Sequence, residues 1–184
     1  MVRVLSLAAA SLALAVVDPP RAAHEPVLAG VRMMYGPSPE TASLDLDALA
    51  RARSSVDMAA FVLTDRGIIG ALGDAARRGV RVRIYLDRSE TARVNEKSND
   101  ALAGLAATPG VAIRYKARGR DAMHLKSYLI DRRILRTGSA NFSYSGERYQ
   151  DNDVVLLESP ALAGAFARNF ETIWARSGNE DFAQ

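Results

Sequence analysis

The residues that could perform chemistry are concentrated between His124 and Asp153. On a strand, His124 and Lys126 point to the same face, because side chains alternate along an extended chain. A cation beside an imidazole favours the neutral ring, whose free nitrogen can act as a nucleophile. Ser139 and Asn141 follow Gly138, which permits a tight turn, and offer a hydroxyl and an amide to the same anion. The set predicts a nucleophile beside an oxyanion-binding group, as displacement at phosphorus requires.

Composition excludes several other kinds of chemistry. The 184 residues include no cysteine and two histidines, which excludes thiol catalysis, disulfides and any zinc site built from several imidazoles. Without the residues that follow it, the His124–Lys126 pair also fits a simpler interpretation than catalysis. His124 would be a hydrogen-bonded core residue, and the Lys126 side chain would extend along the surface to water.

Positive charge gathers in one central stretch of the chain. Residues 111–148 carry nine basic and three acidic side chains, a net charge of +6, whereas residues 24–110 are neutral and residues 149–184 carry −4. Alternate positions at the start of this stretch are basic: Arg114, Lys116, Arg118 and Arg120. On a strand these four side chains would share one face, where they would either protect a sheet edge or attract phosphates.

The first residues have the pattern of a targeting segment. Arg3 is followed by an uncharged run from Val4 to Val17, which is shorter than a membrane-spanning helix and ends at Asp18. We therefore expect residues 1–23 to be a signal peptide and residues 24–184 to form the domain, exported to the periplasm or secreted, with no stable membrane insertion after cleavage. A buried helix and an uncleaved membrane anchor are the alternatives.

Alternating helical and extended patterns predict one α/β domain, a β-sheet covered by helices. Strands are expected at residues 31–35, 56–63, 80–86, 111–116, 123–130, 134–137 and 154–158. Helices are expected at residues 44–53, 65–78, 90–107 and 160–176. The segment 24–42 is expected to be irregular apart from its short strand.

The spacing of the central motif is more specific than the pair alone. His124-x-Lys126, four residues, Asp131, and then Gly138-Ser139-x-Asn141 resembles the HKD signature of the phospholipase D superfamily. The resemblance extends over roughly residues 31–176, through the segments 71–87, 151–155 and 170–174. It implies the phospholipase D/nuclease fold, a mixed β-sheet flanked by helices, with one domain per chain. A single motif in a short chain is similar to the single-HKD-motif endonuclease branch.

The resemblance also implies roles for these residues. His124 would attack the phosphodiester phosphorus to give a phosphohistidine, while Lys126, Ser139 and Asn141 would hold the non-bridging oxygens. This scheme requires no metal, and we expect no metal and no cofactor. The carboxylate that orients the histidine is usually glutamate in the family, and the matching residue here is Asp151.

Other motif positions would act less directly. Asp131 and Gly138 would be structural, and Arg114, Lys116, Arg118 and Arg120 would bind substrate. The family's reaction needs a second histidine as general acid, and His24 is a poor candidate because of its terminal position. The resemblance therefore implies a homodimer with both motifs in one cleft.

Three functions remain open on the sequence. The first is a nonspecific endonuclease acting on DNA, and on RNA as a further substrate, which the basic stretch favours. The second is a phospholipase D-type lipid phosphodiesterase, for which residues 90–107 are the one free amphipathic candidate and are polar in their middle. The third is a non-catalytic nucleic-acid-binding member of the fold, which would have no need of an intact nucleophile.

Overall fold

The chain folds around a single mixed β-sheet in a computed structural model that describes residues 30–92, 96–119 and 121–182. The sheet has eight strands in the order β1-β7-β6-β5-β2-β3-β4-β8, with β2, β3 and β4 parallel and the remaining pairs antiparallel. The strands are β1 (Val31–Tyr35), β2 (Ser55–Ala60), β3 (Arg81–Leu86), β4 (Val111–Tyr115), β5 (Lys126–Ile130), β6 (Ile134–Gly138), β7 (Asp153–Glu158) and β8 (Glu180–Asp181). The predicted α/β fold with a mixed sheet is confirmed.

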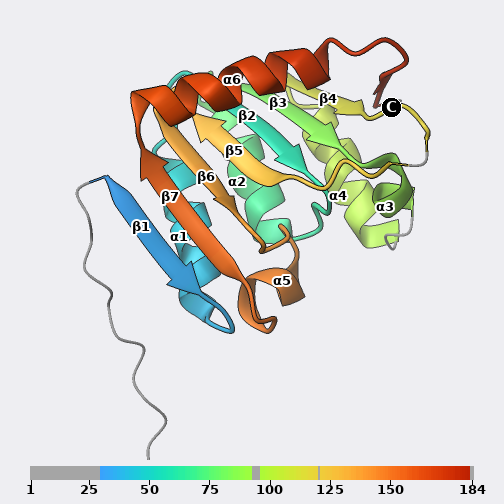
Figure 1. The fold of residues 1–184 in the computed structure, drawn as a ribbon. Helices are drawn as coiled ribbons and strands as arrows, with labels where there is room; N and C mark the ends of the chain where they lie inside the picture. The colour runs from blue at the N-terminus through green and yellow to red at the C-terminus, as the bar shows by residue number, and fades with distance from the viewer. Residues whose placement is uncertain (1–29, 93–95, 120, 183–184) are drawn as a thin grey trace, which may run out of the picture.

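Helices cover both faces of this sheet. They are α1 (Pro39–Ala50), α2 (Arg66–Arg77), α3 (Arg88–Ala92), α4 (Glu96–Ala106), α5 (Tyr144–Arg148) and α6 (Pro160–Trp174). Figure 1 shows α6 running across one face, while α1, α2 and α4 lie behind the sheet on the other. The packing agrees, since α6 contacts β2, β5 and β6, and α2 contacts both α1 and α4.

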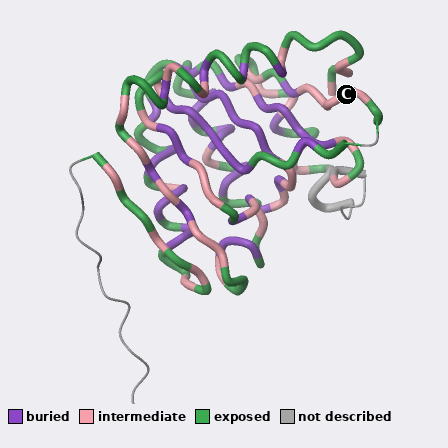
Figure 2. The backbone as a smooth tube through the Cα atoms, viewed as in Figure 1, coloured by how far each residue is buried: buried purple, intermediate pink, exposed green. Residues whose placement is uncertain are grey.

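The hydrophobic core is divided by the sheet into two layers. The larger layer joins the sheet to α1, α2 and α4, and the smaller one lies under α6 around residues such as Phe170 and Ala163. Figure 2 shows the central strands buried and the outer surfaces of the helices exposed. Burial on both faces explains why β2 is buried at every position and reads in the sequence as a nearly continuous apolar run.

Local capping explains where the main helices begin. Asp65 accepts hydrogen bonds from the N–H groups of Gly67 and Ile68 at the start of α2, as its sequence predicts. The helix predicted at residues 44–53 begins five residues earlier, at Pro39, because Ser38 caps it and proline occupies its first position. The segment 24–42 is therefore not irregular throughout.

Strand ends differ from the prediction where a neighbouring strand stops. β4 ends at Tyr115 because its partner β3 ends at Leu86, and β5 begins at Lys126 because it pairs there with Ala60, the last residue of β2. His124 therefore precedes the strand rather than lying on it. Lys116 and Arg118 lie beyond the end of β4, so the prediction that the four alternate cations share a strand face is wrong.

Other differences concern the helices and the N-terminal segment. The helix predicted at residues 90–107 corresponds to two, α3 and α4, and the short α5 was not predicted. The predicted signal peptide, residues 1–23, and His24 lie outside the described residues. Among the residues that the structure describes, no helix has the length and apolar character needed to cross a membrane.

Candidate active site

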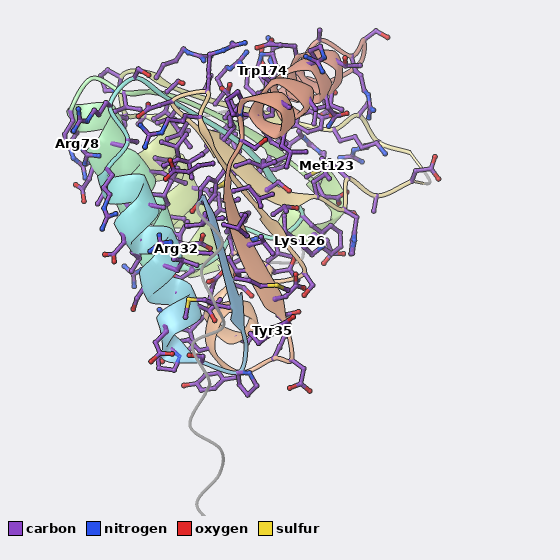
Figure 3. The ribbon with its side chains drawn as sticks, turned by 60° about the vertical axis from the view of Figure 1, so that its left-hand side comes forward. Arg32, Tyr35, Arg78, Met123, Lys126 and Trp174 are labelled. Carbon is purple, nitrogen blue, oxygen red and sulfur yellow. The ribbon has the colours of Figure 1, made fainter. Side chains whose placement is uncertain are left out.

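The motif residues meet where β5 begins and β6 ends. These two strands are antiparallel neighbours, so the start of one and the end of the other lie at the same edge of the sheet. This arrangement brings His124 and Lys126 toward Ser139 and Asn141, which are separated from them by the β5–β6 hairpin in the chain. Lys126, labelled in Figure 3, is well separated from Arg78 at the other end of the molecule.

His124 and Lys126 are in direct contact. The Lys126 Nζ lies 3.2 Å from both Nδ1 and Nε2 of His124 and donates to the His124 carbonyl at 2.9 Å. The ring of Phe61 packs beside both groups, with its centre 4.4 Å from the imidazole centre and 4.7 Å from the Lys126 Nζ. His124 is exposed whereas Lys126 is buried, so the imidazole faces solvent with the ammonium group held behind it.

The electrostatic setting of Lys126 is unusual for a lysine. Burial of its ammonium group, together with the positive charge of Arg136, lowers the Lys126 pKa from its ordinary value. A poorly solvated cation binds an anion more strongly than a hydrated one, because less water must be displaced. This position therefore suits a group that stabilises negative charge on a bound phosphate.

Gly138 and Ser139 form a turn tied to the start of β7. Gly138 has a φ of +138°, and a Cβ atom at this position would overlap the carbonyl oxygen of Asp153, which explains the requirement for glycine. The Ser139 N–H donates to the Asp153 carboxylate at 3.1 Å, and the Asp153 N–H donates to the Ser139 Oγ at 2.9 Å. The hydroxyl is thereby positioned at the sheet edge while remaining exposed.

Asn141 presents a buried polar atom beside the turn. Its Oδ1 has no hydrogen-bond partner among the described residues, which is rare for a buried side-chain oxygen. Its backbone carbonyl accepts from the Ser143 N–H at 2.8 Å. The Asn141 carboxamide is therefore held on a fixed backbone with hydrogen-bonding capacity unused.

Asp131 lies at the opposite end of the β5–β6 hairpin from the site. Its carboxylate accepts hydrogen bonds from the N–H groups of Arg53, Ser54 and Ser55 and from the Ser54 hydroxyl. Burial acts to raise the Asp131 pKa, but these hydrogen bonds outweigh it and hold the pKa below its usual value. The side chain joins the hairpin turn to the segment before β2.

Asp151 is exposed in the segment between α5 and β7. Within the described part of this single chain, no hydrogen bond or ion pair joins it to His124. The carboxylate that contacts a motif residue here is Asp153, through Ser139. A single copy of the chain therefore does not bring the predicted orienting carboxylate to the imidazole.

The basic residues before the motif are dispersed. Arg114 forms an ion pair with Asp181 at 2.7 Å and stacks on Trp174. The Lys116 Nζ donates to the Asp121 carbonyl. Arg118 is exposed in the following loop, and Arg120 lies outside the described residues.

Two buried charged residues near the site, Asp87 and Arg136, were not predicted from the sequence. Asp87, which directly follows β3, accepts a hydrogen bond from the Met123 N–H at 2.7 Å and so fixes the backbone directly before His124. Burial acts to raise the Asp87 pKa, but hydrogen bonds, the Ser89 hydroxyl first among them, hold it below its ordinary value. Arg136 lies in the middle of β6 and is fully buried. The sequence does carry a signal for Arg136, because it is a charged residue within the short strand Ile134–Gly138.

Comparison with known proteins agrees with this geometry. The family described as "Cardiolipin synthase, PLD-like domain" matches residues 46–174, well over half of the chain. The chain belongs to the phospholipase D superfamily. Among the residues described, no group of three or more potential metal-ligating side chains occurs.

Two curated superfamily members resemble similar shares of this chain, 72% and 70%, but different shares of their own length. Phospholipase D of Rickettsia bellii is 31% identical over 137 residues, which cover 72% of this chain and 63% of the relative. Human mitochondrial cardiolipin hydrolase is 30% identical over 129 residues, covering 70% and 49%. The chain thus spans about half to two thirds of these curated relatives.

A solved structure matches over nearly its whole length. The crystal structure of Nuc, a phospholipase D family member from Salmonella typhimurium, superposes with a TM-score of 0.73 at 29% identity, covering 84% of this chain and 98% of that one. This likeness supports the eight-stranded sheet with its flanking helices as the superfamily fold.

Proposed function

We propose that this phospholipase D superfamily member is a metal-independent phosphodiesterase that hydrolyses DNA, with RNA as a further substrate. The observation that carries the proposal is the contact of the Lys126 Nζ with both ring nitrogens of His124 at 3.2 Å. An exposed imidazole supplies the nucleophile, and the buried ammonium stabilises charge on the phosphate oxygens. Ser139 and Asn141 supply further hydrogen bonds from the adjoining turn.

The reaction proceeds in two displacements. A ring nitrogen of His124 attacks the phosphorus, the bond to the leaving oxygen breaks, and that oxygen takes a proton from a general acid. Water then gives a proton to the same group, now a base, and attacks the phosphorus of the phosphohistidine. The phosphorus–nitrogen bond breaks and His124 is restored.

The general acid is His124 of a second copy of the chain. The sequence holds two histidines, His24 and His124, and His124 is the one that lies in the motif. A two-fold homodimer would place both motifs in one cleft. It would also allow Asp151, which is exposed in the single chain, to reach an imidazole across the interface.

Two features favour a nucleic acid as the substrate. Within the basic stretch of residues 111–148, Arg118 is exposed in the loop before the motif and Lys126 lies in the site, and such cations provide affinity for phosphates independent of base sequence. Two exposed tyrosines, Tyr144 and Tyr149, lie on and beside α5 with their ring centres 5.7 Å apart. Arg148 stacks on Tyr144 at 4.5 Å, and such rings suit stacking against bases.

A lipid phosphodiesterase is the second candidate. The curated relatives carry the names phospholipase D and mitochondrial cardiolipin hydrolase. Leu125, between the two motif residues, is exposed and could contact an apolar chain. The same nucleophile would serve a phospholipid headgroup ester.

Cleavage of supercoiled plasmid DNA in excess EDTA tests the proposal. The protein of residues 24–184 is compared with His124→Ala and with His24→Ala, a matched control at the other histidine. We expect nicking by the unaltered protein and by His24→Ala, and none by His124→Ala. Sedimentation analysis of the same samples is expected to show a dimer.

The alternative outcomes are informative. A folded protein that leaves DNA and RNA intact but hydrolyses cardiolipin or phosphatidylcholine vesicles would replace the nuclease with the lipid enzyme. Cleavage that persists in His124→Ala would remove His124 from the mechanism. A monomer with full activity would contradict the proposal that two copies of the chain form one active site.

A further inference from the structure

Arg136 is an arginine with no exposed surface, placed directly behind the motif residues. It lies on β6 opposite Tyr128 of β5, and its side chain is 0% exposed. A buried charge is costly unless it is paired and fully hydrogen-bonded. The contacts that compensate it therefore show what this residue holds together.

One nitrogen of Arg136 joins the two halves of the site. Its Nη1 donates to the Lys126 carbonyl at 2.7 Å and to the Ala140 carbonyl at 3.0 Å. Lys126 follows His124 by two residues, and Ala140 lies between Ser139 and Asn141. The start of β5 and the turn after β6 are thereby tied to the same atom.

The remaining donors of the guanidinium are fixed by two helices. Nε and Nη2 donate to the Asp45 carboxylate of α1 at distances of 2.9–3.3 Å, and Nη2 also donates to Glu147 of α5 at 3.2 Å. The Tyr128 hydroxyl donates to Asp45 at 2.7 Å, and the Phe142 ring covers the guanidinium at 4.4 Å. The five N–H donors of arginine thus all have partners.

We propose that Arg136 is a positioning residue, which sets the distance between the His124–Lys126 segment and the Ser139–Asn141 turn through their backbone carbonyls. Asp45 and Glu147 hold the guanidinium in place. Arg136 touches no substrate in this scheme. Its effect on turnover rests on the proposed phosphodiesterase function, whereas its effect on Lys126 does not.

The chemistry of arginine explains why another cation would not serve. A lysine carries three donors on one nitrogen, whereas Arg136 spreads five donors over a rigid fork that reaches two backbone carbonyls and the carboxyl groups of Asp45 and Glu147. Arg136→Lys therefore keeps the charge and loses the geometry. Misplacement of reacting groups by about 1 Å lowers turnover on the order of 100-fold.

Steady-state hydrolysis of a small chromogenic phosphodiester tests the role of Arg136. We expect Arg136→Lys to lower kcat by about 100-fold with little change in KM, measured well below its unfolding temperature. Asp45→Asn, which loosens the fork without removing it, is expected to give a smaller loss of the same kind. It provides a test if Arg136→Lys fails to fold.

Arg83→Lys is the matched control. Arg83 is also paired with two carboxylates, Asp57 and Glu171, and stacks on Phe170, but it lies under α6 on β3. We expect it to lose stability and to keep its kcat. A wild-type kcat in folded Arg136→Lys, or an equal loss in Arg83→Lys, would overturn the proposal.

A second readout does not depend on activity. The NMR-detected titration of Lys126 is expected to move toward the ordinary lysine pKa in Arg136→Met, because this variant removes a neighbouring positive charge. Arg83→Met should leave it unchanged. If the chain hydrolyses no diester but the Lys126 pKa shifts in Arg136→Met, the proposed function fails and the coupling of Arg136 to Lys126 stands. If the Lys126 pKa is the same in Arg136→Met as in the wild type, that coupling is contradicted.

Discussion

Asp131, the aspartate of the motif, is expected to stabilise the fold without taking part in catalysis. Its carboxylate binds the backbone N–H groups of Arg53, Ser54 and Ser55 at 2.7–3.2 Å, and these residues lead into β2. The informative substitutions are Asp131→Asn, which keeps a side-chain oxygen but no charge, and Asp131→Ala, which keeps neither. Asp47→Asn, at an exposed position of α1, is the matched control.

The expected losses follow from the contacts. Asp131 has a φ of +52°, a left-handed conformation that asparagine tolerates and that costs alanine about 1–2 kcal/mol. Asp131→Ala also leaves the N–H of the buried Ser55 without a partner, at a further cost of about 1–3 kcal/mol, while water replaces the bonds of exposed Arg53 and Ser54. We expect a loss of about 3 kcal/mol for Asp131→Ala and about 1 kcal/mol for Asp131→Asn.

Urea unfolding and turnover on a small diester together provide the assay. The unfolding free energy should fall in the order Asp47→Asn, Asp131→Asn, Asp131→Ala, while kcat per folded molecule stays at the wild-type value in all three. A fall in kcat for Asp131→Asn without any loss of stability would refute this reasoning. It would mean that the carboxylate takes part in the reaction itself.

The contribution of Asp131 should also depend on pH. Because its pKa is lower in the folded chain than the ordinary value of 3.8, the native state binds the proton less readily than the unfolded state. The stabilisation is therefore fully present above the unfolded pKa and is lost as the pH falls through the folded pKa. The stability difference between wild type and Asp131→Asn should shrink below about pH 4.

Two further predictions concern α5. Burial and the nearby Asp45 raise the pKa of Glu147 from 4.5 to about 8. Between these two pH values the native state binds a proton that the unfolded state has lost. The free energy of unfolding of the wild type should therefore decline as the pH rises through this window. Urea unfolding measured across this pH range should show no such decline in Glu147→Gln. If the unfolding free energies of wild type and Glu147→Gln change with pH in parallel, the prediction is wrong. Tyr144→Ala and Tyr149→Ala should each weaken single-stranded DNA binding by about 1–3 kcal/mol and leave small-diester turnover unchanged, as fluorescence anisotropy and kinetics would show. Equal affinities would remove the stacking role.

Much of the fold follows from local patterns in the sequence. The Asp65 cap and the apolar face of α2 lie within one segment, and the start of α6 is likewise marked by Ser159 and Pro160. Such signals operate over a few residues, which is why the helices they mark were predicted at the correct places. The start of α1 was missed although Ser38 and Pro39 were visible, because the apolar pattern after them begins only at Leu44.

The strand ends could not be predicted in the same way. Whether β4 continues beyond Tyr115 depends on where β3 ends, and whether His124 lies on β5 depends on where β2 ends. Both partners are distant in the chain. The expected common face of Arg114, Lys116, Arg118 and Arg120 failed for this reason.

The sequence alone determined the chemical identity of the candidate site. A histidine and a lysine two positions apart, followed at fixed spacing by Gly138, Ser139 and Asn141, identify the superfamily, because these groups lie within 18 residues of chain. One hairpin, β5 to β6, brings these groups to the same edge of the sheet.

The contacts that hold the site in place come from segments far apart in the chain. Arg136 reaches Asp45 across 91 residues, and Asp87 reaches Met123 across 36. Which polar groups become partners in a buried network depends on how α1, β3 and α5 pack against the sheet. No local spacing encodes that packing, because it results from burial of apolar surface contributed by the whole chain.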